Sequence, residues 1–453
     1  MISAPYKSSG KTTISIGLLS NLVAQGETVR SFKKGPDYID SMWLKLASKK
    51  DCYNLDPYLM APEVCRTSLL ENSTGAGMAL IEGNLGLHDG LDIEGSNSSA
   101  GLAKVLDAPV LLVVDSRKMN RGVAALVLGQ QAMQPETKIA GVILNQVRSN
   151  RQEEKQRRAI ETFCKIPVLG AIPEDKEVVI TERHLGLTTV RETEDAQKII
   201  RRAHELVENY CDVKEIKSLF ELAAPIEKST LPNSNIHSEE KSVKIGVFYD
   251  SAFCFYYPDN FNALRRHGAE LVFIDSFKEN SLPEIDGLYL GGGFPESFFE
   301  SLSDNKQLLK DLNDRVQAGL PLYAECGGLI YLCQAAHYNG RKYPLAGILP
   351  FEVGYQKRPV GYGYLDLQSN RHSSWFAKDV EVKAHEFHYS KLIPSDSRDN
   401  FQFKVKRGYG CNGSKDGVLY QNLFASFAHL HSLGSPNWAH NFVKLAGEFK
   451  SNG

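Results

Sequence analysis

A cysteine in the C-terminal half of the chain stands where a nucleophile could be held. Cys326 follows an apolar run of strand character, residues 320–324, and two glycines and a helix-like run, residues 329–335, come after it. A cysteine between a strand and a helix lies on a sharp turn above the helix N-terminus. We expect this position to favour the thiolate, because backbone N–H groups stabilise negative charge there. The alternative is a small buried cysteine without a chemical role.

Two further stretches could complete an amide-cleaving site. Residues 287–296 read as a strand that runs into a glycine-rich turn, and such a turn can direct backbone N–H groups at an oxyanion. The expected donors are the N–H groups of Gly292, Gly293 and Gly327. Farther along the chain, His429 and His431 are candidates for the base that deprotonates the cysteine.

Nucleophile, oxyanion donors and base in this chain order resemble a class I glutamine amidotransferase domain over residues 243–453. The resemblance implies that Cys326 is the nucleophile and His429 the base. Position 431 holds a histidine where many class I members carry a glutamate, so the usual third member of the triad is absent. We therefore expect another group to orient His429 and glutamine hydrolysis to be slower, while the role of His431 stays open.

The N-terminal half opens on a motif that binds phosphate. Residues 4–13 (APYKSSGKTT) precede an apolar helix predicted over residues 14–24, and they form a P-loop whose first glycine is replaced by alanine. Gly10 allows close backbone approach, Lys11 reaches the outer phosphates, and the Thr12 hydroxyl suits Mg²⁺. The sequence therefore predicts a nucleotide site at the start of the first helix.

Polar side chains recur where the predicted strands of this half end. Strands are predicted over residues 28–32, 78–81, 109–114, 139–144 and 166–172, with helical patterns between them. This alternation predicts a parallel sheet flanked by helices, and a new strand at residues 244–249 restarts the same α/β pattern. Sites in such sheets lie at the carboxyl ends of the strands. The side chains found there are Lys33, Asp37, Asp40, Glu82, Asp115 and Asn145. For residues 33–40 the alternative is a solvated, charged turn.

Six motifs along the chain together resemble the cobyrinic acid a,c-diamide synthase family. They are FKKGPDYID (32–40), NLDPYLM (54–60), EGNLGLHDG (82–90), FYYPDN (255–260), GGGFPE (291–296) and HEFHYS (385–390). These enzymes join an ATP-dependent amide synthetase domain, similar to dethiobiotin synthetase, to a glutaminase domain. We therefore expect an α/β protein of two domains, each a mainly parallel sheet flanked by helices. The expected boundaries are a synthetase domain at 1–211, a helix end and polar linker at 212–242, and an amidotransferase-like domain at 243–453.

The resemblance also implies roles for residues of the first half. The ATP phosphates would be bound by Gly10, Lys11, Thr12 and Thr13, and adenine would lie near Asn145. Mg²⁺ would be held by Thr12, Asp37 and Glu82. The reacting carboxylate and its acyl phosphate would be surrounded by Lys33, Asp37, Tyr38, Ile39 and Asp40.

The implied reaction transfers ammonia from glutamine to the a and c acetate carboxylates of a polycarboxylate tetrapyrrole, cobyrinic acid, after ATP activates each carboxylate. A sirohydrochlorin or sirohaem-type ring is the alternative substrate, because GNLG at 83–86 replaces the commoner GVMG and RPVGYGY at 358–364 also departs from the pattern. An alternative from another class is a partition-type P-loop ATPase with a non-catalytic amidotransferase-like domain. Its signature lysine would stand five residues before Lys11, where this chain has Tyr6.

Composition limits the remaining classes. The chain has 453 residues, which suits two domains, and its formal net charge of −2 gives no electrostatic reason to bind nucleic acid. No segment approaches the roughly 20 apolar residues that span a bilayer. Eight cysteines without a Cys-x-x-Cys pair indicate a reducing cytoplasm. His385 and His388 are expected on a strand and not in a metal pair. The short first strand suggests a natural start upstream of Met1, and a homodimer is compatible with all these features.

Overall fold

The computed structural model describes residues 1–175, 177–178, 188–193, 195–223, 243–394, 400–435 and 437–452. The chain divides into two compact units, residues 1–231 and 232–453. The division falls inside the predicted linker, residues 212–242. The first part of that linker forms a helix, α8 (Val213–Glu221), and residues 224–242 lie outside the described residues.

The first unit is built on a parallel sheet. Among the described residues the sheet has seven strands in the order β3-β2-β4-β1-β5-β6-β7, and neighbouring strands run parallel. The strands are β1 (Ile2–Ser3), β2 (Val29–Lys34), β3 (Tyr53–Leu55), β4 (Met78–Glu82), β5 (Val110–Asp115), β6 (Ile139–Val147) and β7 (Val168–Pro173). Most of their residues are apolar and buried, as expected for a sheet covered on both faces.

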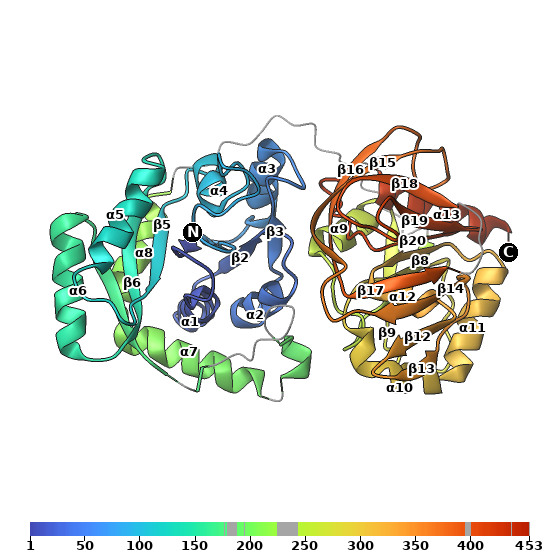
Figure 1. Cartoon of the computed structure of the whole chain (residues 1–453), viewed down its shortest axis with the longest axis horizontal. Helices are drawn as coiled ribbons and strands as arrows, with labels where there is room; N and C mark the ends of the chain where they lie inside the picture. The colour runs from blue at the N-terminus through green and yellow to red at the C-terminus, as the bar shows by residue number, and fades with distance from the viewer. Residues whose placement is uncertain are drawn as a thin grey trace. The chain divides into compact units, whose positions relative to one another are not determined.

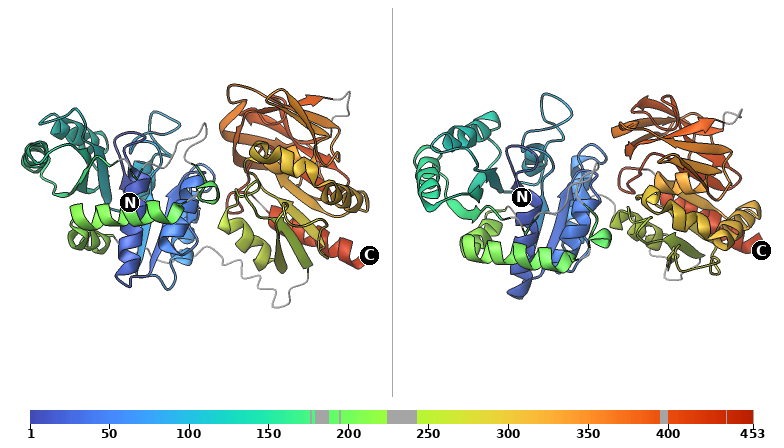
Figure 2. Two further views of the ribbon diagram at one scale, coloured as in Figure 1. Left: turned by 90° about the horizontal axis from the view of Figure 1, so that it is seen from below. Right: turned by 60° about the horizontal axis from the view of Figure 1, so that its bottom comes forward.

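Helices cover both faces of this sheet. Figure 1 shows α1, α2 and α7 at one face and α3 and α4 at the other, while α5 packs against α6. In both views of Figure 2 the light green α7 lies across the dark blue α1. The two helices approach so closely that a Cβ on Gly17 would lie 2.4 Å from the carbonyl oxygen of Ala203. The bounds are α1 (Lys11–Ala24), α2 (Ile39–Ser48), α3 (Pro62–Asn72), α4 (Ser99–Val105), α5 (Val123–Met133), α6 (Asn150–Phe163), η1 (Val190–Glu192) and α7 (Ala196–Tyr210).

The second unit combines parallel and antiparallel strands. Its nine-stranded sheet has a parallel part in the order β20-β11-β10-β8-β9, and the antiparallel strands β16-β15-β18-β19 extend it beyond β20. The bounds are β8 (Val243–Phe248), β9 (Ala269–Ile274), β10 (Gly287–Leu290), β11 (Leu322–Glu325), β15 (Gly361–Ser369), β16 (Glu381–His388), β18 (Phe401–Arg407), β19 (Lys415–Tyr420) and β20 (Leu423–Ser426). A separate four-stranded sheet consists of β12 (Ala335–Tyr338), β13 (Arg341–Pro344), β14 (Phe351–Tyr355) and β17 (Ser390–Pro394).

Aromatic side chains fill the core beneath the parallel part of this sheet. Tyr323 stacks on Trp438 with ring centroids 4.6 Å apart, and it also stacks on Phe424. Tyr289 meets the Tyr323 ring edge to face. These rings join strands β10, β11 and β20 to the C-terminal helix α13. The helices of the unit are α9 (Pro258–Arg266), η2 (Pro295–Phe298), α10 (Phe299–Asp304), α11 (Lys306–Gln317), α12 (Gly327–Leu332) and α13 (Trp438–Asn452).

The predicted α/β class of both units is confirmed, with differences in particular elements. The first helix begins at Lys11 and not at residue 14, because Gly10 adopts the left-handed conformation that starts it. Strand β3 and the antiparallel strands of the second unit were not predicted, except that a strand was expected at residues 385–388, which belong to β16. Helix α12 begins at Gly327 and ends at Leu332, earlier at both ends than the predicted run 329–335. Within the described residues no helix has the length and apolar character needed to cross a bilayer.

Candidate functional site

The P-loop is held in shape by a side chain from a distant strand. Gly10 has φ +93°, and a Cβ at this position would lie 2.1 Å from Nδ2 of Asn145. That amide nitrogen donates a hydrogen bond to the Ser9 carbonyl oxygen at 2.9 Å. Asn145 ends up beside the P-loop because β6 and β1 both neighbour β5 in the sheet. Its predicted place near adenine stays a prediction.

Lys11 and Thr12 point toward the carboxyl ends of the strands. Nζ of Lys11 donates to the Leu85 carbonyl oxygen at 2.7 Å. Burial, and next the charge of Lys33, lower the pKa of Lys11 to about 8. The Thr12 hydroxyl donates to Oε1 of Glu82 at 2.7 Å, and Thr13 follows on α1, half-buried. The second contact brings together two of the predicted residues, Thr12 of the P-loop and Glu82 of β4.

A buried lysine connects the predicted acidic residues. Nζ of Lys33 lies 2.6 Å from Oδ2 of Asp40 and 2.9 Å from Oε1 of Glu82. Burial by itself would lower the pKa of Lys33, but the Asp40 and Glu82 carboxylates outweigh it and raise that pKa. Burial raises the pKa of Glu82. Of the side chains that were predicted at strand ends, Lys33, Asp40 and Glu82 therefore form one charged cluster. Asp115 lies outside it and pairs with Arg117 at 2.7 Å.

Asp37 is the most unusual acid of this cluster. Its Oδ1 accepts the Asp40 N–H at 2.9 Å, at the start of α2. Burial, and next the charge of Asp40, raise the pKa of Asp37 to about 7. The carboxyl group therefore changes charge near neutral pH. Tyr38 and Ile39 lie between the two aspartates in the sequence, and both are buried. Their contact with substrate stays a prediction.

The donor set at this edge fits Mg²⁺ bound together with phosphate. Within the described part of the chain, Oε2 of Glu82 is buried and has no hydrogen-bond partner, and the Thr12 hydroxyl lies against the same carboxylate. The described residues contain no group of three or more His, Cys, Asp or Glu that could hold a metal. Mg²⁺ is commonly bound by one or two carboxylates together with substrate phosphates and water. A hydroxyl and a carboxylate beside a P-loop meet that requirement.

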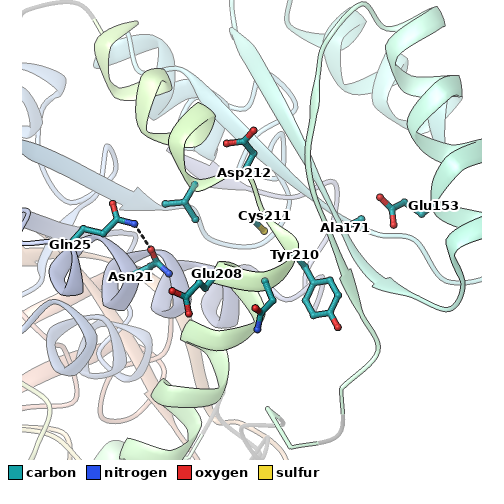
Figure 3. A pocket seen from close by; sticks show the side chains of 10 residues that line it. Asn21, Gln25, Glu153, Ala171, Glu208, Tyr210, Cys211 and Asp212 are labelled. Atoms are coloured by element: carbon teal, nitrogen blue, oxygen red, sulfur yellow. Dashed lines mark hydrogen bonds between the residues drawn. The ribbon is translucent and has the colours of Figure 1, made fainter.

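A separate groove of the first unit lies away from this cluster (Figure 3). It has a volume of about 640 Å³ and lies at the end of α1 opposite the P-loop. None of the residues that line it was predicted as a site residue: Asn21, Gln25, Glu153, Ala171, Glu208, Asn209, Tyr210, Cys211, Asp212 and Val213. The predicted chemistry of this unit is therefore at the other end of the helix.

In the second unit, Cys326 lies on the expected turn between a strand and a helix. It follows β11 and precedes α12, with φ 46° and ψ −98°. Its N–H donates to the Ser426 carbonyl oxygen at 2.7 Å, so the turn is fixed to the end of the neighbouring parallel strand β20. His429 follows three residues after that strand. Adjacent parallel strands thus bring the predicted nucleophile and base to one edge of the sheet.

The three predicted oxyanion glycines gather around the same turn. The Gly293 nitrogen lies 3.2 Å from the position of a Cβ on Gly327. Gly292 lies against the ring of His429, because a Cβ added at Gly292 would be 2.4 Å from Cε1 of that histidine. Gly293 has φ +155°, and a Cβ there would meet the Ala252 carbonyl oxygen at 2.0 Å. The close packing explains why these positions hold glycine.

The prediction that Cys326 favours the thiolate is wrong for this structure. Burial raises the pKa of the thiol, and the charge of Glu296 adds to that effect. The Gly327 N–H acts in the opposite direction but is outweighed. A helix of only six residues contributes little compensating charge, and the low-dielectric surroundings favour the neutral thiol. Cys326 therefore needs a base to become a nucleophile.

His429 has two neighbours that the sequence analysis did not identify. Its Nδ1 lies 3.6 Å from Oε2 of Glu325, the residue directly before Cys326. Its ring stacks on His385, with centroids 4.8 Å apart and planes 18° apart. An isolated antiparallel bridge also joins His385 to His429. The acid directly before the nucleophile was visible in the sequence, but no spacing rule connected it to His429.

The other histidines of the site are held by separate partners. Nε2 of His431 lies 3.4 Å from Oδ2 of Asp259. His388 contacts the Ser390 carbonyl oxygen with Nδ1 and Oε2 of Glu386 with Nε2, at 2.8 and 3.2 Å. His385 and His388 lie on strand β16, as predicted. No metal cluster involving these residues occurs in the described ranges.

The geometry can be compared with known proteins. Residues 4–187 match the family described as "CobQ/CobB/MinD/ParA nucleotide binding domain", and residues 244–437 match "CobB/CobQ-like glutamine amidotransferase domain". The chain is 46% identical over 445 residues to a cobyrinate a,c-diamide synthase of Magnetococcus marinus, covering 97% of this chain and 95% of the relative.

Two further relatives carry the same name. The protein of Archaeoglobus fulgidus is 39% identical over 438 residues, covering 96% of this chain and 95% of the relative. The protein of Caldanaerobacter subterraneus is 36% identical over 438 residues, covering 95% of this chain and 94% of the relative. Both matches extend across the nucleotide-binding and the amidotransferase-like parts of the chain. The chain therefore belongs to the cobyrinate a,c-diamide synthase family.

Proposed function

We propose that the chain catalyses the ATP-driven, glutamine-dependent amidation of the a and c acetate carboxylates of cobyrinic acid. One observation carries this proposal: a single chain holds a P-loop cluster suited to carboxylate activation and a Cys326–His429 site suited to releasing ammonia from glutamine. Neither site completes an amidation by itself. A carboxylate reacts with ammonia only after activation, and ammonia released in solution is mostly protonated at neutral pH.

The first unit carries the activation step. ATP supplies the γ-phosphoryl group that makes the substrate carboxylate a mixed anhydride, and Mg²⁺ offsets the charge on the phosphates. The N–H groups at the start of α1 and the Lys11 ammonium would bind the phosphates, while Thr12, Asp37 and Glu82 would hold the metal ion. Lys33 lies between Asp40 and Glu82 and would keep these carboxylates from repelling the incoming substrate carboxylate. Asn145 would act through the P-loop backbone that it holds.

The second unit carries the release of ammonia. His429 would take the proton of the Cys326 thiol as the sulfur attacks the glutamine amide carbon. The N–H groups of Gly293 and Gly327, with the Gly292 turn, would stabilise the oxyanion. The C–N bond then breaks, and the leaving nitrogen takes the proton from the His429 imidazolium to leave as ammonia. Water hydrolyses the thioester to glutamate and restores the thiol.

The substrate is tested by mass spectrometry. Cobyrinic acid and sirohydrochlorin are each incubated with the protein, ATP, Mg²⁺ and glutamine, and each amidation lowers the mass by about one unit because NH₂ replaces OH. Two successive losses on cobyrinic acid alone are expected. Losses on sirohydrochlorin alone would move the proposal to that ring, and release of ammonia without change to either ring would overturn the substrate assignment.

The division of labour is tested with the P-loop lysine. Lys11→Met is expected to abolish amidation with glutamine or with added ammonia, while glutamate release from glutamine persists. Lys7→Met is the control, because Lys7 is exposed on the same loop. Amidation by Lys11→Met at the rate of the unchanged protein would contradict the proposed role of the P-loop.

We also infer a cytoplasmic location and activity without nucleic acid. The formal net charge of −2 and the eight cysteines support this inference. A homodimer stays a prediction. Light scattering of the purified chain distinguishes a dimer from a monomer of 50.3 kDa.

A further inference from the structure

The orientation of the glutaminase base is the open question in the second unit. A histidine that removes a thiol proton with Nε2 must carry its other proton on Nδ1, and an acceptor beside Nδ1 fixes that tautomer. Position 431, where a glutamate would supply the acceptor in many class I domains, holds a histidine in this chain. The acceptor must therefore come from elsewhere in the fold.

Glu325 has the position and the rigidity that this role requires. It is fully buried on β11, and its Oε2 lies 3.6 Å from Nδ1 of His429. Its other oxygen, Oε1, accepts the Tyr323 hydroxyl at 2.7 Å and the Leu430 N–H at 3.0 Å. The Leu430 bond fixes the backbone next to His429, and the Tyr289 hydroxyl donates to Oε2 at 3.3 Å. The carboxylate is thus held by three donors before His429 is considered.

The other groups near His429 are engaged differently. The His385 ring stacks on the His429 ring, so His385 presents its ring face to His429 and directs no acceptor at Nδ1 of His429. Burial, and next the nearby histidines, lower the pKa of His385 well below its usual value, so it stays neutral. His431 has its own acid in Asp259, at 3.4 Å. A glutamate in place of His431 would lie beside Asp259, and the two negative charges would repel each other.

We propose that Glu325 is the positioning carboxylate of the glutaminase base, so that the acid of the triad stands directly before the nucleophile and not two residues after the base. This inference rests on the proposed glutaminase activity of Cys326 and His429. Glu325 does not touch glutamine. It holds Nδ1–H of His429 and stabilises the imidazolium that forms while the thiol proton resides on Nε2.

The separation of 3.6 Å is consistent with this role. It is longer than a hydrogen bond to a neutral imidazole, and such contacts shorten when charge develops in the reacting complex. The proton moves from Sγ to Nε2 of His429 and then to the departing nitrogen, so Glu325 itself gains no proton. The carboxylate acts only through the charge and the orientation of the ring.

The test compares two isosteric variants, Glu325→Gln and Asp259→Asn. Glutamine keeps acceptors for Tyr323 and Leu430 but loses the charge, and we expect kcat for glutamate release to fall by about 10²–10⁴-fold with little change in KM. Asp259→Asn is matched in chemistry and faces His431, and it should change kcat less than about threefold. The opposite ranking would assign the positioning role to the Asp259–His431 pair and overturn the proposal.

The pH profile separates positioning from simple support of the fold. Removing the negative charge beside His429 lowers the stability of its imidazolium, so the acidic limb of kcat/KM should move to lower pH in Glu325→Gln. Glu325→Asp should restore part of kcat and part of the shift. An unmoved acidic limb in Glu325→Gln, with kcat reduced, would indicate a structural role and overturn the proposal.

Two further measurements distinguish failure of this inference from misfolding of the variant and from failure of the proposed function. Amidation driven by added ammonia should be unchanged in Glu325→Gln, which shows that the chain is folded. The pH dependence of Cys326 alkylation by iodoacetamide should shift in the same direction as the kcat/KM limb, without need of turnover. If the unchanged protein releases no glutamate, the glutaminase assignment fails. If it does so and Glu325→Gln matches it, this inference alone fails.

Discussion

The two sites of this chain control charge in opposite ways. The P-loop cluster concentrates charge, with Lys11, Lys33, Asp37, Asp40 and Glu82 close together at the strand ends. The Cys326 site is built from buried groups, aromatic rings and glycines. Phosphoryl transfer needs charges that face charged phosphates. Release of ammonia from a neutral amide needs surroundings in which thiol and ammonia stay neutral until they react.

The pKa values of the two sites express this difference. Burial and neighbouring charges bring the pKa of Lys11 to about 8 and that of Asp37 to about 7, so both titrate near neutral pH. In the second unit burial raises the pKa of Cys326 and lowers that of His385, which holds both in their neutral forms. Lys11 and Asp37 of the first site therefore change charge near neutral pH, whereas the Cys326 thiol of the second site becomes charged only as it reacts.

Cys326→Ser gives the largest expected effect and separates the two sites most sharply. Glutamate release should fall by about 10³-fold or more, because a serine hydroxyl is a far weaker nucleophile beside the same base. Amidation with added ammonia should persist. Cys333→Ser is the control, since Cys333 is also buried and its thiol donates to the Leu329 carbonyl oxygen. Glutaminase activity equal in both variants would remove Cys326 from the reaction.

Lys33→Met tests whether charge holds the first site together. The variant leaves Asp40 and Glu82 near each other without their shared cation, and the free energy of unfolding of the first unit should fall by about 3–5 kcal/mol. Lys45→Met breaks an exposed pair with Asp51 and should cost less than about 1 kcal/mol. Urea denaturation of both variants measures the difference. Equal losses would mean that the buried cluster contributes no special stability.

Gly292→Ala tests whether close packing holds the second site together. The new Cβ would overlap the His429 ring, and a displaced base should reduce glutamate release by about 10²-fold. The matched change is Gly447→Ala on α13, where a Cβ would lie 3.8 Å from Val243 and is tolerated. Kinetics of glutamate release in both variants provide the comparison. Full activity in Gly292→Ala would show that the ring position is not limiting.

The pH dependence of stability gives the smallest expected effect and concerns Asp37. Its folded pKa of about 7 lies above the unfolded value, so the folded chain keeps a proton that the unfolded chain has released. Raising the pH from about 5 to 8 therefore removes the part of the stability that Asp37 contributes. Asp37→Asn should abolish that loss, whereas Asp51→Asn should keep it. The midpoint of urea denaturation is measured across this pH range for the unchanged protein and for both variants. A parallel change in all three would contradict the assignment of the pH dependence to Asp37.

The sequence predicted the parts of both sites that depend on local motifs and parallel strands. A parallel sheet brings its strand ends to one edge, so the P-loop, Lys33 and Glu82 met as expected. The relation of Cys326 to Gly293 and Gly327 followed for the same reason. Their chemical roles stay predictions.

The rest depended on contacts between distant segments. His385 reaches His429 through an antiparallel bridge from β16, a strand without a spacing signal that connects it to the nucleophile. Glu325 was in view beside Cys326, but only the fold places its carboxylate next to His429. The pKa of Cys326 depends on burial, which a local strand–turn–helix pattern does not reveal.

The backbone of Cys326 has a consequence for how this chain can change over time. A side-chain-bearing residue at φ 46° and ψ −98° costs on the order of 1–3 kcal/mol, and glycine adopts such angles with little penalty. Selection for stability alone would therefore favour glycine at position 326, and selection for catalysis opposes it. A descendant that no longer needs glutamine as its nitrogen source should lose the thiol early, and it should become more stable when it does.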